Sequence, residues 1–278
     1  MRLHVHYETS YSYSEPARRV IQLLRLTPHS FLGQSVIDWR IDVNCDARLR
    51  EGRDGYGNAI HMLYVDRPVG QLIVTVTGSV LSEDRAGVVA GLPSDLPPLV
   101  FLRETDLTHC DAALGELGAA LDHQGGSALE KLHRLMGLLH MRMRFDTGGT
   151  ETGTSAAESF SAGHGVCQDF AHIFIAVARA IGVPARYVSG HIFRRDESVL
   201  QPAAHAWAEG WIEDLGWVAF DPANGICPDD AYIRVAAGLD YLDAAPFAGA
   251  RTGGGIEDLE VAVQVTKERR QAQMQMQN

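Results

Sequence analysis

The sequence lacks the cysteine pairs that build zinc sites and disulfide frameworks. Its four cysteines (Cys45, Cys110, Cys167 and Cys227) lie far apart and form no C-x-x-C motif. It also lacks any apolar run near the ~18 residues of a membrane helix. Its first residues, MRLHVHYETSYSY, alternate polar and apolar types without the apolar core of a secretory signal. We therefore expect a cytoplasmic protein that does not contact membranes, in which a lone thiol stays reduced.

Clusters of basic residues are absent as well. The 278 residues include 24 Lys and Arg against 35 Asp and Glu, which gives a net charge of −11. Because proteins that follow a phosphate backbone carry basic blocks or stripes, nucleic acid is excluded as an expected partner. The acidity is explained by solubility. Hydrophobic residues make up 46% of the chain, enough for a full core in one large domain or two modest ones.

The first 88 residues have the alternation of β-strands. In VIDWRIDVN, apolar side chains at every second position alternate with charged ones, which predicts a half-buried strand with Ile37 and Trp39 on its buried face. QLIVTVTGSV is rich in β-branched residues and predicts another strand, and DGYGN at residues 54–58 is a turn signal. We expect an antiparallel β-domain over residues 1–88, followed by the proline-rich connector GLPSDLPPL.

Helical patterns begin after the connector, in a segment that we assign to the core over residues 89–245. Two Ser-x-x-Glu patterns, at residues 127–130 and 155–158, have the spacing of capping boxes at helix starts. An apolar helical stretch runs from Cys167 to Gly182, where a glycine is a common helix end. ARYVSGHI, HAWAEGWI and WVAFDP then predict three strands, the last two joined in a hairpin by EDLG.

The last segment, residues 246–278, contains one more strand pattern, LEVAVQV, which we expect to return to the N-terminal sheet. ARTGGG at residues 250–255 predicts a flexible crossing before that strand. The polar sequence after the strand predicts a frayed tail.

Cys167 lies where a glycine-containing turn, GHGVC, becomes a helix. The first N–H groups of a helix have no partner within the helix, and together with the helix dipole they favour a thiolate over a thiol. The thiolate is the nucleophilic form of cysteine, and the same N–H groups can bind an oxyanion when the sulfur attacks a carbonyl. The position suits a nucleophile, although a free cysteine is also a common small residue of a hydrophobic core.

A base and a carboxylate follow Cys167 in the order that nucleophilic catalysis needs. His205 begins the strand HAWAEGWI, and Asp221 ends the next strand in VAFDP, so a hairpin between them brings the two side chains near each other. An imidazole can activate a thiol, and a carboxylate fixes the tautomer of that imidazole. Taken singly, His205 could be a structural histidine and Asp221 a turn residue before Pro222. Taken together and in this order, Cys167, His205 and Asp221 favour a catalytic role over these structural ones.

Over these residues the sequence resembles the transglutaminase-like superfamily. The motifs that carry the resemblance are GHGVCQDFAHIFIAVARAIGVPARYVSGHI, HAWAEGWIEDLGWVAFDP and the spacing between them. The chain is most similar to the bacterial branch of transglutaminase-like cysteine peptidases, in which a β-rich N-terminal region precedes the core. The resemblance implies an α+β fold, with a papain-like transglutaminase core in which a central helix packs on an antiparallel sheet, preceded by an antiparallel β-domain.

The resemblance also implies roles for individual residues. Cys167 would be the nucleophile, His205 the general base and acid, and Asp221 the residue that orients the imidazole. The backbone N–H of Cys167 would be one oxyanion donor, and Gln168 is the adjacent candidate for a second donor or a pocket residue. Many relatives have a serine or aspartate just before the active-site histidine, where this chain has PAAH. That difference leaves the surroundings of His205 open.

Three further residues are candidates for the pocket. Asp169 and His172 match the bacterial pattern, with helix capping and buried polar packing as their alternatives. Trp207 lies on the same strand face as His205 and could line an acyl cleft, its alternative being a place in the core. Arg194 and Arg195 precede a loop that leads to His205, so they could attract an acidic substrate, although such a pair is often a solvated hairpin tip.

The resemblance favours a thiol hydrolase that cleaves peptide or side-chain amide bonds through a thioacyl-enzyme. An acyl transferase shares the first half of that reaction and uses an amine in place of water. A binding module that keeps the fold without turnover is the third alternative. The substrate expected is a peptide or protein amide, and a homo-oligomer is left open.

A metalloenzyme is a fourth alternative because histidines surround Cys167 in the sequence. Their spacing fits none of the usual zinc patterns. No acidic loop of the EF-hand type is present either, so calcium is not expected. We therefore expect no metal and no cofactor.

Overall fold

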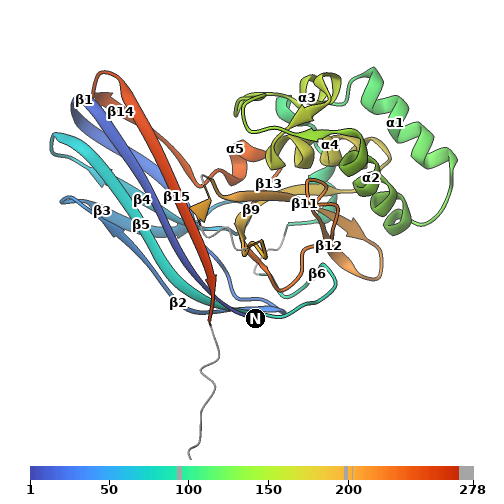
Figure 1. Ribbon diagram of the computed structural model, residues 1–278, viewed down its shortest axis with the longest axis horizontal. Coiled ribbons are helices and arrows are strands. Elements are labelled where there is room, and N and C mark those ends of the chain that lie inside the picture. Colours follow the sequence, from blue (N-terminus) through green and yellow to red (C-terminus); the bar gives the residue numbers. More distant parts are fainter. Residues whose placement is uncertain (93–95, 197–199, 202, 269–278) are drawn as a thin grey trace, which may run out of the picture.

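The computed structural model describes residues 1–92, 96–196, 200–201 and 203–268. It has two parts, a large antiparallel β-domain and an α+β core, most of whose helices lie on the side away from the β-domain (Figure 1). The centre of the proline-rich connector and the polar tail after Glu268 lie outside the described residues. Within the described residues, no helix is both long enough and apolar enough to cross a membrane.

The β-domain is one antiparallel sheet built around the 26-residue strand β1. The first half of β1 pairs with β5 and β15, and its second half pairs with β4 and β14. β2 extends the sheet beyond β5, and β3 extends it beyond β4. The short β10 adds to the free edge of β15. The strands of this sheet are β1 (Arg2–Thr27), β2 (Gln34–Val43), β3 (Arg48–Arg53), β4 (Ala59–Val65), β5 (Val69–Ser82), β10 (Leu200–Gln201), β14 (Phe247–Gly253) and β15 (Glu257–Lys267).

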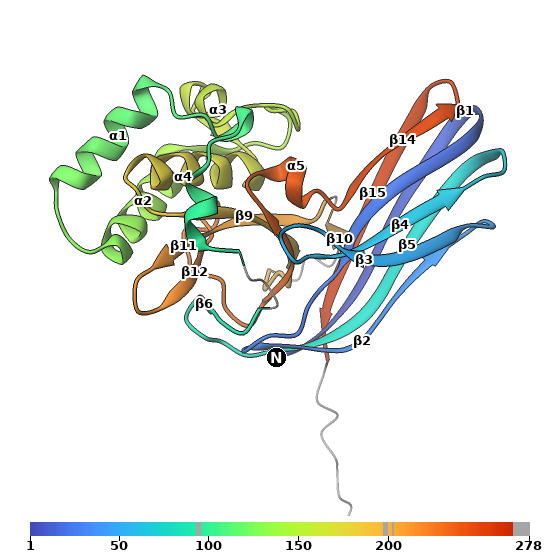
Figure 2. The ribbon, with the colours of Figure 1, turned by 180° about the vertical axis from the view of Figure 1, so that it is seen from behind.

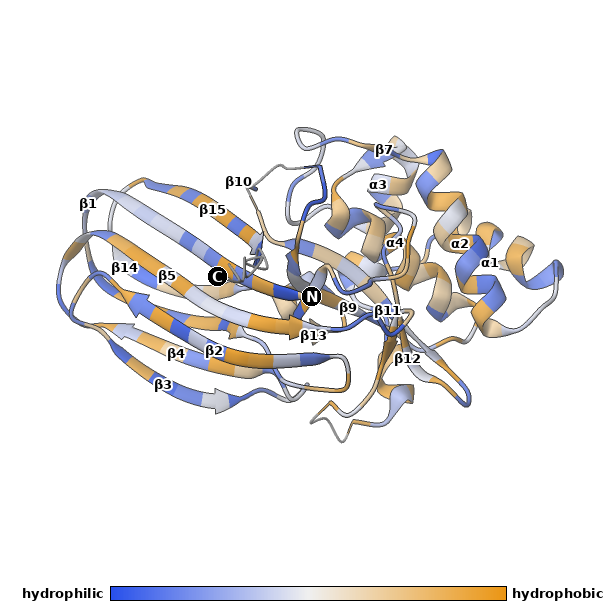
Figure 3. Ribbon diagram, turned by 60° about the horizontal axis from the view of Figure 1, so that its bottom comes forward, coloured by the Kyte–Doolittle hydropathy of each residue, from blue (hydrophilic) through white to orange (hydrophobic). Residues whose placement is uncertain are grey.

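Alternation of side chains explains how the β-domain buries one face. Along β1, Leu3, Val5 and Tyr7 are buried, whereas His6 between them is exposed. Hydrophobic and hydrophilic positions alternate in the same way along β15 (Figure 3). The buried face of the β-domain joins the same hydrophobic cluster as the helices of the core.

The predicted facing of Ile37 in β2 is wrong. Ile37 is 50% exposed, whereas Trp39 packs against the core. The pairing of β2 with β5 shifts register between Val36 and Asp38, which is a β-bulge. A bulge moves the residues on one side of it to the opposite face, and a strict period of two does not reveal it.

The C-terminal segment adds two strands to the β-domain. β14 and β15 both pair antiparallel with β1. The flexible crossing predicted over residues 250–255 is wrong for its first part, because residues 250–253 continue β14. The turn itself needs glycine, since Gly253, Gly254 and Gly255 have positive φ angles of 75°, 96° and 61°.

The core sheet has the strand order β13-β9-β11-β12-β6, with every pair antiparallel. The helix α4 packs on one face of this sheet, and α1, α2 and α3 pack around α4 (Figure 2). The predicted arrangement of a central helix on an antiparallel sheet is therefore confirmed. The strands are β6 (Val88–Val89), β9 (Ala185–Ile192), β11 (His205–Ile212), β12 (Gly216–Phe220) and β13 (Tyr232–Gly238).

Three helices, α2, α3 and α4, begin where the sequence predicts, whereas α1 and α5 were not predicted. Ser127 and Ser155 accept N–H bonds from Glu130 and Glu158, whose carboxylates accept bonds in return, so both capping boxes are present. α4 begins at Cys167 and is buried over most of its length. The helices are α1 (Ala112–His123), α2 (Ala128–Arg142), α3 (Ala156–Ala162), α4 (Cys167–Ala180) and α5 (Tyr241–Ala244), with 3-10 turns at Pro98–Leu102 and Asp106–Thr108.

Small residues on β11 let the helices approach the sheet. Ala206 and Ala208 are buried in the same cluster as α4. At Gly210 a Cβ would lie 2.4 Å from Cδ1 of Leu132 in α2, so a side chain there would push that helix away. The alternate residues Trp207 and Glu209 consequently face away from the helices, where Trp207 lines a cavity toward the β-domain and Glu209 bonds Arg186 and Arg234.

Candidate active site

Cys167 is the first residue of α4, and a tight turn leads into it. Before it, the short strands β7 (Arg144–Phe145) and β8 (His164–Gly165) pair in parallel. A Cβ at Gly165 would lie 2.6 Å from the Asp169 carboxylate and 2.8 Å from the Ser159 hydroxyl, so the turn closes only around a glycine. Cys167 itself is half-buried. Its sulfur therefore lies at a helix N-terminus, on a residue that is only partly buried.

Two residues of the first turn of α4 hold the loop of residues 147–154. Asp169 accepts hydrogen bonds from the Thr150 hydroxyl at 2.6 Å and from the Val166 N–H at 2.8 Å. The side-chain amide of Gln168 donates to the Thr152 carbonyl at 3.0 Å. One N–H of Gln168 is thus engaged by the loop, and Asp169 caps its own helix while burial raises the pKa of its carboxyl.

His205 and Asp221 meet across the hairpin of β11 and β12. Nε2 of His205 lies 2.6 Å from Oδ2 of Asp221. The side chain of His205 is 12% exposed, and that of Asp221 is fully buried. The pairing of Asp221 with Ile226 turns the chain sharply just after β12, which fixes the carboxylate at the end of the strand.

Five donors surround the Asp221 carboxylate. Oδ1 accepts the backbone N–H groups of Ala223 at 3.0 Å and Asn224 at 3.1 Å. Besides the His205 bond, Oδ2 accepts the Tyr232 hydroxyl at 2.8 Å and the side-chain amide of Asn224 at 2.7 Å. A buried carboxylate with this many donors stays ionised and fixed in orientation.

The side chains of His205 and Asp221 shift each other's pKa values. Burial lowers the pKa of His205, but the charges of Asp221 and Cys167 and hydrogen bonds to both outweigh it and raise the pKa to about 10. Burial raises the pKa of Asp221, but His205 and the hydrogen bonds hold it below its usual range. Because Asp221 engages Nε2, Nδ1 is the ring nitrogen left for the Cys167 thiol.

A cleft of about 560 Å³ opens at His205. Phe145, which is 54% exposed, and Ile226, which is 42% exposed, line it with apolar surface. Phe145 pairs with Gly165, two residues before Cys167, so the cleft borders the turn that carries the sulfur. The remaining described lining residues are Ile192, Phe193, Arg194, Arg195, Asp196, Gln201, Ala223, Asn224, Asp229, Ala231 and Tyr232.

The two arginines of the cleft are paired within the protein. Arg194 contacts Asp196, and Arg195 contacts Asp229 at 2.8 Å and Asp230 at 3.4 Å. An acidic substrate would therefore compete with these carboxylates for the guanidinium groups. These arginines are part of the cleft wall.

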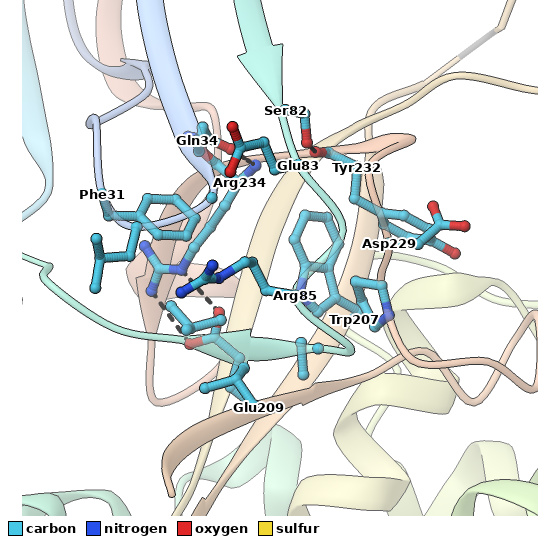
Figure 4. Close-up of a pocket in the computed structure, with 17 residues that line it drawn as sticks. Phe31, Gln34, Ser82, Glu83, Arg85, Trp207, Glu209, Asp229, Tyr232 and Arg234 are labelled. Atoms are coloured by element: carbon cyan, nitrogen blue, oxygen red, sulfur yellow. Dashed lines mark hydrogen bonds and ion pairs between the residues drawn. The ribbon is translucent and has the colours of Figure 1, made fainter. Parts of the chain in front are cut away.

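The structure places the other pocket candidates away from the cleft. His172 is fully buried, its Nε2 accepts the Tyr241 N–H at 3.1 Å, and burial lowers its pKa to about 3, so its ring is neutral. Trp207 is 2% exposed, and its ring lies 6.2 Å from that of His205. It lines a small cavity between the core sheet and the β-domain (Figure 4).

Sequence reasoning missed four residues of the site. Asn224 and Tyr232 hold Asp221, and Phe145 and Ile226 line the cleft. Asn224 follows Asp221 by three residues, and an Asn near a strand end is a common turn signal. Tyr232 comes from β13, a strand that the sequence reasoning did not assign. Among the described residues, no group of three or more His, Cys, Asp or Glu side chains is arranged to hold a metal ion.

Comparisons with known proteins show the family of this chain. Residues 116–222 match the transglutaminase-like superfamily, and residues 3–81 match the bacterial transglutaminase-like N-terminal region. An uncharacterized protein of Mycobacterium tuberculosis is 30% identical over 89% of this chain and 87% of its own length.

Two further relatives extend the comparison. A crystal structure from Cytophaga hutchinsonii, described as a candidate cysteine protease, matches 97% of this chain and 92% of its own, with a TM-score of 0.77 and 21% identity. At that identity the likeness shows the fold. A protein-glutamine gamma-glutamyltransferase of Pseudomonas aeruginosa is 32% identical over 113 residues, which are 34% of this chain and 16% of that protein.

Proposed function

We propose that this chain, which belongs to the transglutaminase-like superfamily and carries its bacterial N-terminal region, is a thiol hydrolase that cleaves peptide or side-chain amide bonds. In this proposal Cys167 is the nucleophile, His205 is the general base and acid, and Asp221 orients the imidazole. The family and the fold of the Cytophaga protein support cysteine-type hydrolysis or acyl transfer in general.

One observation carries the proposal. The buried Asp221 carboxylate lies 2.6 Å from Nε2 of His205, Cys167 helps to raise the pKa of that imidazole, and Cys167 is the first residue of α4. A histidine that had only a structural role would need neither a bond to a buried carboxylate nor the electrostatic influence of a thiol at a helix N-terminus. The arrangement favours a thiolate–imidazolium pair, which is the reactive form of a cysteine hydrolase.

The reaction follows from this pair. The sulfur attacks the amide carbonyl carbon, and the oxygen takes the negative charge, where the backbone N–H of Cys167 is one donor. The C–N bond then breaks as His205 gives its proton to the leaving amine, which leaves a thioester on Cys167. Water attacks the thioester while His205 takes a proton from it. Breakage of the S–C bond releases the carboxylic acid and restores the thiolate.

Acyl transfer is the second candidate, and the relative from Pseudomonas aeruginosa favours it. That protein carries the name of a glutamyltransferase, and the similarity lies over 113 residues. In acyl transfer an amine attacks the thioester in place of water, so every earlier step is shared. Hydrolysis is preferred here because of the cysteine peptidase branch that the whole chain resembles.

A single experiment separates these functions from a binding module. Peptide and protein amides are incubated with the wild type and with Cys167→Ser, with and without a fluorescent primary amine. Released amine without incorporation of the fluorophore supports hydrolysis, and incorporation supports transfer. If neither is seen and Cys167 reacts no faster than an ordinary thiol, the binding module replaces both.

A further inference from the structure

Tyr232 reaches Asp221 from the far edge of the core sheet. It is the first residue of β13, which is separated from β11 by β9, and its hydroxyl lies 2.8 Å from Oδ2 of Asp221. Its ring meets Trp207 edge-on, with 5.5 Å between centroids. At Gly190 in β9, a Cβ would lie 2.6 Å from the Trp207 ring and 2.1 Å from the Ile233 carbonyl, so glycine makes room for this packing.

The β-domain occupies the outer edge of β13 with two side-chain amides. Gln34 accepts the Arg234 N–H at 2.8 Å and donates to the Arg234 carbonyl at 2.9 Å. Asn58 accepts the Ala237 N–H at 2.8 Å and donates to the Ala237 carbonyl at 2.7 Å. Each amide thus supplies both bonds that a neighbouring strand would supply. Figure 4 shows Gln34 beside Arg234, at the cavity that Tyr232 also lines.

Other contacts tie the same strand to both parts of the protein. Ser82, at the end of β5, donates to the Tyr232 carbonyl at 3.5 Å. On the inner side, Arg234 reaches Glu209 of β11 at 2.8 Å, where both side chains are buried. The position of β13 is therefore set jointly by the β-domain and by the core sheet.

We propose that Tyr232 is a positioning residue for the His205–Asp221 pair, and that the β-domain sets its position by holding the edge of β13. This inference rests on the proposed function. The Tyr232 hydroxyl occupies Oδ2 of Asp221, which keeps the carboxylate ionised and aimed at Nε2 of His205. The β-domain thereby acts on catalysis through the edge of β13.

The expected consequence is a change in pH dependence. The Tyr232 bond is one of the interactions that hold the pKa of Asp221 below its usual range. Without it the carboxylate takes up a proton at a higher pH as acid is added, and the thiolate–imidazolium pair loses its counter-charge there. Besides Asp221, His205 and Cys167 themselves, the titratable or charged groups nearby are Asp229, which interacts with Tyr232, Arg195, which pairs with Asp229, and His140, which bonds the Ala223 carbonyl.

The first test compares two tyrosines that each donate to an aspartate. Tyr232→Phe removes the bond to Asp221, and Tyr56→Phe removes a bond of 2.5 Å to Asp243 outside the cleft. The rate of Cys167 alkylation by iodoacetamide is measured against pH for both variants and the wild type. The acid limb of the profile is the range in which the alkylation rate falls as the pH decreases. Tyr232→Phe should move this limb to a pH about one unit higher, the size expected for one hydrogen bond to a carboxylate. Tyr56→Phe should leave the limb unchanged.

The second test asks whether the β-domain acts through Tyr232. Gln34→Met removes both amide bonds to β13 at nearly constant volume, and it is combined with Tyr232→Phe in a double-mutant cycle. We expect Gln34→Met alone to shift the acid limb in the same direction and to add nothing in the Tyr232→Phe background. If Gln34→Met does not fold by circular dichroism, Gln34→Glu, which keeps one acceptor, takes its place in the cycle.

The outcomes separate this inference from the proposed function. If wild-type Cys167 has no acid-shifted reactivity, the proposed function fails first. If Cys167 is reactive but Tyr232→Phe shifts its profile no more than Tyr56→Phe does, Tyr232 has only a structural role and the inference is overturned. If the shifts of Gln34→Met and Tyr232→Phe are additive, the link through β13 is overturned.

Discussion

The Asp221 carboxylate and the His205 ring, carried by adjacent strands, are joined by a bond of 2.6 Å that is almost closed to solvent. In such a bond the charge of the carboxylate stabilises the imidazolium, and burial increases the effect because water does not screen it. The ionised Asp221 carboxylate at the end of β12 thus holds the His205 ring at the beginning of β11.

Asp221→Asn should remove that charge while keeping the shape of the side chain. Because the carboxylate raises the pKa of His205 toward about 10, its loss lowers this pKa, and activity that needs the imidazolium declines at a lower pH as the pH rises. We expect kcat/KM for amide hydrolysis to fall roughly 10²–10⁴-fold. We also expect the decline of activity at high pH to begin at a lower pH than in the wild type. Asp122→Asn, at an exposed aspartate paired with Lys131, is the control. Equal pH profiles of kcat/KM for Asp221→Asn and Asp122→Asn would contradict the role of Asp221 as the residue that orients and charges His205.

Much of this geometry was predictable because it depends on local patterns. Cys167 at the start of a helix, and His205 and Asp221 on neighbouring strands, follow from turn signals and alternation. Tyr232 was not predictable in the same way. Its role depends on β13 lying two strands away from β11 in the sheet, and strand order is not written in any local pattern.

The interface between the β-domain and the α+β core also could not be predicted from local sequence patterns. Gln34 and Asn58 lie in turns or strand ends of the β-domain, yet they pair with Arg234 and Ala237, which follow them by 200 and 179 residues. Nothing in the neighbouring sequence distinguishes them from solvent-exposed amides. Bulges such as the one near Ile37 cannot be predicted from the sequence for a related reason, because one extra residue leaves the composition of a strand unchanged.

Gly190 should not tolerate a methyl group. Because a Cβ there would lie 2.1 Å from the Ile233 carbonyl and 2.6 Å from the Trp207 ring, Gly190→Ala forces the strands or the indole to move. We expect the free energy of unfolding in urea to fall by about 1–3 kcal/mol. Gly115→Ala in α1 is the matched control, since a Cβ there meets nothing within 4 Å. It should stabilise by roughly 0.5–1 kcal/mol, and a loss at Gly115 equal to that at Gly190 would contradict the packing argument.

Glu209→Gln should leave two buried guanidinium groups without their carboxylate. Glu209 lies 2.6 Å from Nε of Arg186 and 2.8 Å from Nε of Arg234, and all three side chains are buried. Breaking a buried pair from one side costs about 3–5 kcal/mol, which denaturant unfolding would measure. Asp66→Asn, at an exposed carboxylate that bridges two arginines, should leave the midpoint unchanged. Equal midpoints for the two variants would show that the buried cluster carries no special weight.

Phe145→Ala should change which reagents reach Cys167. The cleft beside His205 is lined by the exposed side chains of Phe145 and Ile226, so an apolar group on the reagent gains contact area there. We expect N-benzyl iodoacetamide to label Cys167 about 10-fold faster than iodoacetamide in the wild type, after both are normalised to glutathione. Phe145→Ala should lose most of this preference.

The control for that prediction is Leu242→Ala, which removes a side chain that is 64% exposed on α5 and does not line the cleft. Its preference for the benzyl reagent should equal that of the wild type. A preference that is absent in the wild type, or that survives in Phe145→Ala, would show that the apolar surface of the cleft does not contact the reagent.

The central claim is that Cys167 and His205 form a reactive pair, and the most direct test is the pH profile of iodoacetamide alkylation in the wild type and in His205→Ala. Intact mass and peptide mapping score each cysteine, and Cys45 and Cys110 serve as internal references because burial raises the pKa of both thiols. We predict that Cys167 reacts well below the ordinary thiol range near pH ~8.5, and that His205→Ala moves its profile upward. Alkylation of Cys167 no faster than that of Cys45, or only after unfolding, would contradict the account.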